Sequence, residues 1–67
     1  MKNTIKVERA IHELTQEQLA QKVQVSRQTI NAIEKGKYVP STVLALKIAR
    51  EFNKQLEEIF KLESEDL

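Results

Sequence analysis

The stretch of sequence that decides the fold is residues 15–35, TQEQLAQKVQVSRQTINAIEK. It opens with a capping box, because the Thr15 hydroxyl can accept one free backbone N–H at a helix start while the Gln18 side chain reaches back to another. A helix is therefore expected over about residues 16–23. Its buried face would consist of Leu19, Ala20 and Val23, with Ala20 small enough to let a second helix approach closely.

That second helix is expected directly afterwards, over residues 26–35. Ser26 is its candidate cap, and Ile30 and Ile33 lie on one face. Only the dipeptide Gln24-Val25 separates the two helices, which is too short for an antiparallel hairpin and favours a steep crossing. The sequence thus predicts two short helices that cross through a tight turn.

The outer face of the second helix is polar. It carries Arg27, Gln28, Asn31 and Lys35, flanked by Ser26 and Thr29. Arginine can donate two hydrogen bonds to guanine, and glutamine or asparagine can pair with adenine through two bonds. The start of the helix also offers free N–H groups to a phosphate. The alternative is an ordinary solvated face, but the lack of carboxylates and alternating ion pairs favours contact with a DNA groove.

Three further helices are expected around this pair. One covers residues 4–12, with Ile5, Arg9 and Ala10 spaced for one face. The next is capped by Ser41 and carries the most apolar stretch of the chain, over residues 43–52, so it should form the core. A short fifth helix holds Leu56, Ile59 and Phe60.

One loop and the two ends complete the chain. Gly36 and Pro40 bracket the loop, with Gly36 where a left-handed residue commonly ends a helix. Residues 1–3 and 60–62 could pair as a two-stranded ribbon, which would be marginal alone.

Length and composition bound the class of protein. Sixty-seven residues permit one domain, with its core over residues 4–60 and an acidic tail over residues 61–67. The absence of cysteine excludes a disulfide-stapled scaffold and thiolate metal sites. No apolar run approaches the roughly 20 residues of a membrane helix, and no signal-peptide pattern follows Met1. A cytoplasmic protein is therefore expected.

Charge is divided unevenly along the chain. Residues 1–50 hold nine Lys or Arg and four Glu, a balance of +5, whereas residues 51–67 hold two Lys and six acidic residues, a balance of −4. A basic body with an acidic end suits a domain that faces an anion on one side only.

Several short motifs together resemble one known family. They are QEQLA at residues 16–20, VSRQTI at 25–30, IEKG at 33–36 and the dipeptide Pro40-Ser41. This set resembles the lambda repressor/Cro-like helix-turn-helix family, the xenobiotic-response-element group of bacterial, archaeal and phage regulators. The resemblance covers about residues 4–60. It implies an all-α, five-helix domain whose third helix enters the major groove of DNA.

The resemblance also assigns roles to individual residues. Gln16 resembles the family glutamine that touches a phosphate, and Arg27 and Gln28 occupy base-reading positions. Asn31 and Ala32 follow on the next turn, while Lys35 and Lys37 match positions that contact the DNA backbone. The DNA-binding residues expected in this chain are Gln16, Ser26, Arg27, Gln28, Thr29, Asn31, Lys35, Lys37 and Tyr38.

Two positions depart from the family pattern, and one pair is expected to follow it. Gln24 stands in the turn where the family usually has glycine, so a left-handed glutamine should cost on the order of 1 kcal/mol. Glu8 stands where many members carry an apolar residue, which leaves the packing of the first helix open. The resemblance places the first helix beside the end of the third, so Arg9 should pair with Glu34.

The function implied is sequence-specific regulation of transcription, as a repressor rather than an activator by family habit. The protein would bind a pseudo-palindromic operator as a homodimer. The predicted dimer contact is Leu56, Ile59, Phe60 and Leu62, because these are more apolar side chains than so short a segment can easily bury alone.

Other functions have less support in the sequence. His12 is the only histidine, so no metal cluster is expected, and no phosphate loop or nucleophile motif points to an enzyme. No cofactor, small-molecule ligand or membrane partner is expected. The alternative function is an antitoxin-like or adaptor module that binds another protein. A longer appended segment than residues 61–67 would favour that alternative.

Overall fold

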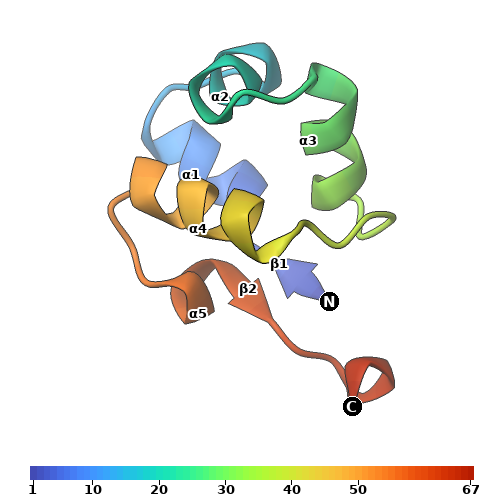
Figure 1. Ribbon diagram of the computed structural model, residues 1–67. Coiled ribbons are helices and arrows are strands. Elements are labelled where there is room, and N and C mark those ends of the chain that lie inside the picture. The colour runs from blue at the N-terminus through green and yellow to red at the C-terminus, as the bar shows by residue number, and fades with distance from the viewer.

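The computed structural model describes all residues, 1–67, as five short helices joined to a two-stranded antiparallel ribbon (Figure 1). This confirms the expected five-helix architecture. In chain order the elements are β1 (Lys2–Asn3), α1 (Ile5–Ile11), α2 (Gln16–Val23), α3 (Arg27–Glu34), α4 (Thr42–Glu51), α5 (Leu56–Ile59), β2 (Phe60–Lys61) and a 3₁₀ turn (Ser64–Asp66).

The helix starts carry the caps that the sequence predicts. The Thr15 hydroxyl accepts the backbone N–H of Gln18 at 3.0 Å, and the Gln18 side chain accepts the N–H of Thr15 at 2.9 Å, which completes the capping box of α2. The hydroxyls of Ser26 and Ser41 cap α3 and α4 in the same way, at 3.2 and 3.1 Å. Each cap satisfies an N–H group that the helix itself leaves free.

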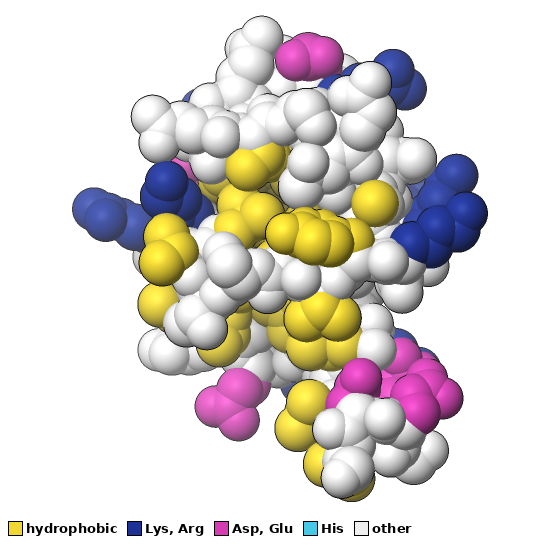
Figure 2. Space-filling model, turned by 45° about the vertical axis from the view of Figure 1, so that its right-hand side comes forward, with side chains coloured by type: hydrophobic (Ala, Val, Ile, Leu, Met, Phe, Trp, Pro, Cys, Tyr) yellow, Lys and Arg dark blue, Asp and Glu magenta, His cyan; other side chains and the backbone are white.

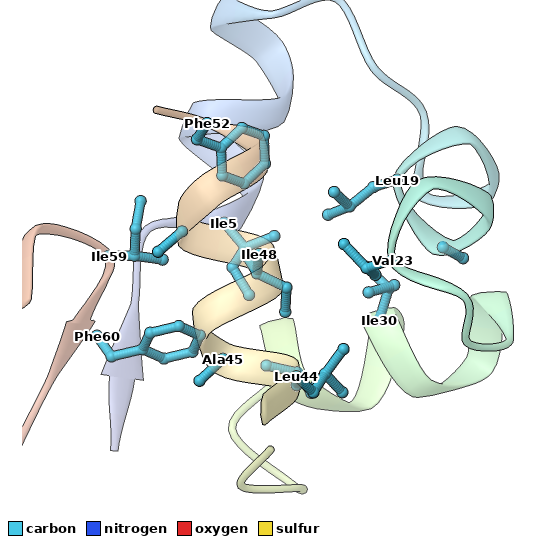
Figure 3. Close-up of a cluster of buried hydrophobic side chains, with 13 residues drawn as sticks. Ile5, Leu19, Val23, Ile30, Leu44, Ala45, Ile48, Phe52, Ile59 and Phe60 are labelled. Carbon is cyan, nitrogen blue, oxygen red and sulfur yellow. The ribbon is translucent and has the colours of Figure 1, made fainter. Parts of the chain in front are cut away.

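The core is one cluster of 13 buried apolar side chains to which all five helices and β2 contribute. Helix α4 lies at its centre with Leu44, Ala45, Ile48 and Ala49, and Phe52 follows directly after it (Figure 3). Leu19 and Val23 of α2 and Ile30 of α3 face it from one side. The apolar stretch over residues 43–52 therefore supplies the centre of the core, as expected, but its Val43 and Leu46 side chains are exposed.

The turn between α2 and α3 adopts the strained conformation expected of it. Gln24 has φ +63° and ψ +45°, in the left-handed region. Ala20 is fully buried, and its carbonyl accepts the N–H of Val25 at 3.0 Å. The Gln24 side chain accepts a hydrogen bond from Lys47 of α4 at 3.2 Å. The steep crossing of α2 and α3 is thus achieved without a glycine.

The terminal ribbon forms between Lys2 and Lys61 and between Asn3 and Phe60. Asn3 also connects it to the rest of the domain, because its side-chain N–H donates to the carbonyl of Ile33 at 2.8 Å. That carbonyl lies near the end of α3, where helix carbonyls lack partners within the helix. The ribbon is therefore hydrogen-bonded to the end of α3 and is not an isolated pair of strands.

The predicted dimer contact is partly wrong. Ile59 is fully buried and Phe60 nearly so within one chain, while Leu56 packs against the core. Helix α5 and β2 fold back onto α4, which supplies the partner surface that the sequence alone left unassigned (Figure 3). Of the four residues only Leu62 is largely exposed, at 68%. Ile59 and Phe60 are core residues of the single chain.

Glu8 is buried in α1 rather than displayed on its surface. Its carboxylate accepts a hydrogen bond from the Lys54 ammonium at 2.8 Å, just beyond α4. Helix α1 therefore packs with a charged residue at a position that is often apolar in the family. No helix of the structure is both long and apolar enough to cross a membrane.

Candidate nucleic-acid interface

Helix α3 presents a polar hollow on the side facing away from the core. Four side chains line this hollow: Arg27, Gln28, Asn31 and Lys35. The buried residues of α3 are Ile30 and Ile33, so the helix rotation that buries these two turns the polar set outward. These are four of the expected DNA-binding residues, and the fold brings them together.

The start of α3 places two hydroxyls beside this hollow. Ser26 is exposed and Thr29 is half-buried, and their hydroxyl oxygens lie 3.0 Å apart in a hydrogen bond. The backbone N–H of Thr29 is already taken by Ser26. These two residues therefore fix the first turn of α3, next to Arg27 and Gln28.

An ion pair anchors the other side of α3. The Arg9 guanidinium donates to the Glu34 carboxylate through Nε at 2.6 Å and through Nη2 at 3.1 Å. A third donor, Arg9 Nη1, reaches the carbonyl of Leu14 at 3.0 Å. The expected Arg9–Glu34 pair is confirmed, with the two-bond geometry that makes such pairs strong.

Gln16 links that ion pair to the polar hollow. Its side-chain nitrogen lies 3.2 Å from a Glu34 carboxylate oxygen and 3.2 Å from the side-chain oxygen of Asn31. Gln16 and Asn31 are both half-buried. The start of α2 is therefore bonded to the middle of α3, a link that sequence reasoning missed because no pattern couples two amides 15 residues apart.

Lys35, Lys37 and Tyr38 lie at and beyond the end of α3, all exposed. Gly36 has φ +73°, and the N–H of Lys37 returns to the carbonyl of Ala32 at 2.9 Å. This glycine closes the helix as expected and turns the chain across the end of α3. Tyr38 lies apart from the polar hollow, beside Val25, Thr29 and Val43.

The acidic tail is held at the far end of α3. The amino group of Met1 pairs with Glu63 at 2.9 Å and with Asp66 at 3.1 Å, beside Lys35 and Gly36. Hydrogen bonds to these carboxylates raise the pKa of the Met1 amine above its usual value. The backbone N–H of Glu63, and then the Met1 amine, lower the pKa of the Asp66 carboxyl.

The charged side chains are spread unevenly over the surface. Figure 2 shows hydrophobic side chains gathered in the middle of one face, Lys and Arg mainly at its left and right edges, and the largest group of Asp and Glu at the lower right, with other acidic side chains scattered elsewhere. The exposed end of the chain thus carries negative charge, while the polar hollow of α3 carries Arg27 and Lys35.

Two short crossing helices, a polar outer face on the second and a cap at its start define the helix-turn-helix class of DNA-binding domain. The helix-turn-helix family model matches residues 5–59, nearly the whole chain. The chain belongs to the lambda repressor/Cro-like helix-turn-helix family.

Several proteins that align with this chain over nearly their whole length are also described as helix-turn-helix regulators. An uncharacterized HTH-type transcriptional regulator of Methanocaldococcus jannaschii is 59% identical over 66 residues, which cover 98% of this chain and 100% of the relative. A second, from Bacillus subtilis, is 52% identical with the same coverage, and one from Archaeoglobus fulgidus is 52% identical over 100% of this chain and 94% of its own. The protein is a DNA-binding regulator of this type.

Proposed function

We propose that the protein is a repressor that binds a pseudo-palindromic operator as a homodimer, with α3 of each copy in the major groove. The observation that carries this proposal is the polar hollow on α3, which collects four side chains capable of reading base edges. A domain bound over a promoter blocks transcription by occupancy, so repression requires nothing beyond tight binding. Such a regulator would act in the cytoplasm, where bacterial and archaeal chromosomes lie.

The DNA-facing residues divide into two groups. Arg27 and Gln28 stand on the first turn of α3 and would contact base edges, with Asn31 behind them. Lys35, Lys37 and Tyr38 lie at the far end of α3 and in the loop, where they would contact the DNA backbone together with the hydroxyls of Ser26 and Thr29. Base contacts specify the sequence, whereas backbone contacts fix position and add affinity.

The homodimer needs a contact surface other than Ile59 and Phe60. Large apolar side chains are exposed on the loop before α4 and on its first two turns, and we name these three the apolar patch: Val39, Val43 and Leu46. Val43 and Leu46 stand three residues apart and share one face of α4. Because this patch adjoins the end of α3, a two-fold pairing through it would keep both reading helices near the two-fold axis.

DNA binding is tested by first selecting sites from a random duplex pool. The wild-type protein should enrich an inverted repeat whose half-site centres lie about one helical turn apart, roughly 34–36 Å. Arg27→Ala should then weaken binding to that operator by roughly 1–3 kcal/mol and relax preference at one base position per half-site.

Lys37→Ala should act differently on the same duplexes. It should weaken an operator and a scrambled duplex about equally and reduce the salt slope by about one unit. If Arg27→Ala lowered affinity for both duplexes by the same factor, Arg27 would be a backbone contact, and α3 would lose its assignment as the reading element.

The apolar patch is tested by sedimentation of matched variants. Leu46→Glu should convert the wild-type dimer to a monomer, because a carboxylate would be buried in the contact. Val7→Glu places the same charge on an exposed apolar position of α1, outside the patch, and should leave the dimer intact. A wild-type protein that remains monomeric at high micromolar concentration, alone and on its operator, would refute the dimer.

A further inference from the structure

The hydrogen bonds among Arg9, Glu34 and Gln16 fix which atom Asn31 shows to its surroundings. The Glu34 carboxylate has no hydrogen to donate, so it can only accept. It already accepts two bonds from Arg9, and the amide of Gln16 lies 3.2 Å from one of its oxygens. Gln16 must therefore turn its NH₂ group, and not its carbonyl, toward Glu34.

The orientation of the Gln16 amide also fixes the orientation of the Asn31 amide. The Gln16 nitrogen lies 3.2 Å from the Asn31 amide group, and an amide nitrogen can only donate. Asn31 must therefore turn its carbonyl oxygen inward, which leaves its NH₂ group pointing away from Gln16. This assignment follows from the chemistry of the partners and does not depend on telling nitrogen from oxygen by position.

Asn31 lines the polar hollow, and its NH₂ group is the end of the amide that Gln16 does not hold. This NH₂ group makes no hydrogen bond within the protein, and Asn31 lines the hollow with Arg27, Gln28 and Lys35. Arg27 and Lys35 can only donate as well, so Gln28 alone brings an acceptor there. The hollow therefore presents mainly hydrogen-bond donors to a bound molecule.

Guanine and adenine differ in the number of hydrogen-bond acceptors that they present. In the major groove guanine shows two acceptors, N7 and O6, whereas adenine shows one acceptor and the N6 donor. A free asparagine pairs with adenine by donating and accepting together. An asparagine whose oxygen is held toward Gln16 turns its NH₂ group to the groove. It therefore loses the two-bond pairing with adenine, in which oxygen and nitrogen must face the base together, and sets its NH₂ group against the N6 donor of that base.

We propose that Gln16 is a positioning residue that holds the Asn31 oxygen inward and turns its NH₂ group outward, so that Asn31 selects guanine over adenine in each half-site. The proposal rests on the proposed entry of α3 into the major groove. It also changes the expected role of Gln16, since both of its N–H groups are engaged inside the protein and neither is left for a phosphate.

The test compares site preferences selected from a random duplex pool by four proteins: wild type, Asn31→Ala, Gln16→Leu and Gln16→Lys. Asn31→Ala identifies the base position that Asn31 reads, because preference there should disappear. At that position the wild type should favour guanine over adenine by roughly fivefold to a hundredfold, the range of one good base contact. Gln16→Leu keeps the size of the side chain but donates nothing, so the guanine preference should fall to about twofold or reverse.

Gln16→Lys is the matched rescue, because an ammonium at this position can still donate to both Glu34 and Asn31. It should retain the wild-type guanine preference even if its added charge raises affinity for all DNA. A Gln16 with a merely structural role would change affinity or melting temperature in Gln16→Leu without moving the base preference.

Three results would overturn the proposal: adenine favoured by the wild type at the Asn31 position, an unchanged preference in Gln16→Leu, or no preference lost in Asn31→Ala. Each of them leaves sequence-specific binding by α3 intact. A wild type that enriches no site at all would instead refute the proposed function, and this inference with it.

Discussion

Glu8 and Glu34 are both glutamates with more than nine-tenths of the side chain buried, and each is paired with one cation. Their surroundings differ. Both oxygens of Glu34 are bonded, to Arg9 by two bonds and to Gln16 by a third. Glu8 receives one bond from Lys54, and its second carboxylate oxygen is buried without a hydrogen-bond partner.

The difference indicates which of the two pairs stabilises the fold. Taking a carboxylate out of water costs several kcal/mol, and the attraction of its partner offsets this only when the remaining lone pairs are also satisfied. Glu34 meets that condition and Glu8 does not. The site of Glu34 also joins α1, α2 and α3, whereas the Glu8 pair joins α1 to the turn after α4.

The largest effect is expected from breaking the satisfied pair. Glu34→Ala should lower the free energy of unfolding by about 3–5 kcal/mol, because it strands the Arg9 guanidinium in a site with little access to water. A chain of this length has a total stability of only about 3–10 kcal/mol, so the variant should be partly unfolded at room temperature. Urea unfolding followed by circular dichroism measures the loss.

Arg9→Lys is the control for that measurement. It keeps the charge but loses the two-bond geometry, so it should cost less than Glu34→Ala and more than a surface substitution. A loss below about 1 kcal/mol in Glu34→Ala would place the pair among ordinary surface ion pairs and remove its special role.

A smaller loss is expected at Gln16, which extends the satisfied network. Gln16→Leu removes two hydrogen bonds from a half-buried site and should cost about 1–2 kcal/mol. In a double-mutant cycle with Glu34→Gln the two losses should not add, because they share one bond. Strict additivity would show that Gln16 and Glu34 act independently.

The satisfied pair could be predicted from the sequence, and the other could not. Arg9 and Glu34 follow from a motif resemblance that places α1 beside the end of α3. The Glu8–Lys54 pair joins residues 46 apart and depends on the chain reversal after α4, where Asn53 takes a left-handed φ of +54°. No local pattern sets the geometry of that reversal, so Glu8 could only be marked as a departure from the family.

The difference between local and long-range contacts also explains which other sequence predictions are correct and which are wrong. Caps and helix positions are local, and Thr15, Ser26 and Ser41 act as their spacing predicts. Whether an apolar side chain meets its own chain or a second copy is not local. The sequence predicts that Ile59 and Phe60 meet a partner, because nothing in residues 56–62 reveals that the segment folds back onto α4.

A change close to zero is expected when the unsatisfied carboxylate is removed. Glu8→Leu should leave the free energy of unfolding within about 1 kcal/mol of wild type, or raise it, because leucine has similar volume and leaves no unpaired oxygen. The Lys54 side chain keeps 38% of its surface exposed and can be hydrated once its partner is gone. A loss above about 2 kcal/mol would mean that the second oxygen has a partner after all.

The smallest effect is expected in alkaline solution, where Lys54 loses its proton. The hydrogen bond from Lys54 to Glu8, and then the charge of Glu8, raise the pKa of Lys54 above its ordinary value of 10.5. The folded protein therefore holds this proton more tightly than the unfolded chain does. The stabilisation is fully present below pH 10.5 and is lost as the pH rises through the higher pKa of the folded state.

Comparison with Glu8→Leu isolates this contribution. The Met1 amine, whose pKa is also raised, is present in both proteins, so its effect cancels in the difference. Urea unfolding between pH 9 and pH 11.5 should show wild type losing stability more steeply than Glu8→Leu above about pH 10.5. The exposure of Lys54 to solvent keeps the extra slope small. Parallel curves would mean that Lys54 gains nothing from Glu8, so that the buried carboxylate would lack even its one stabilising partner.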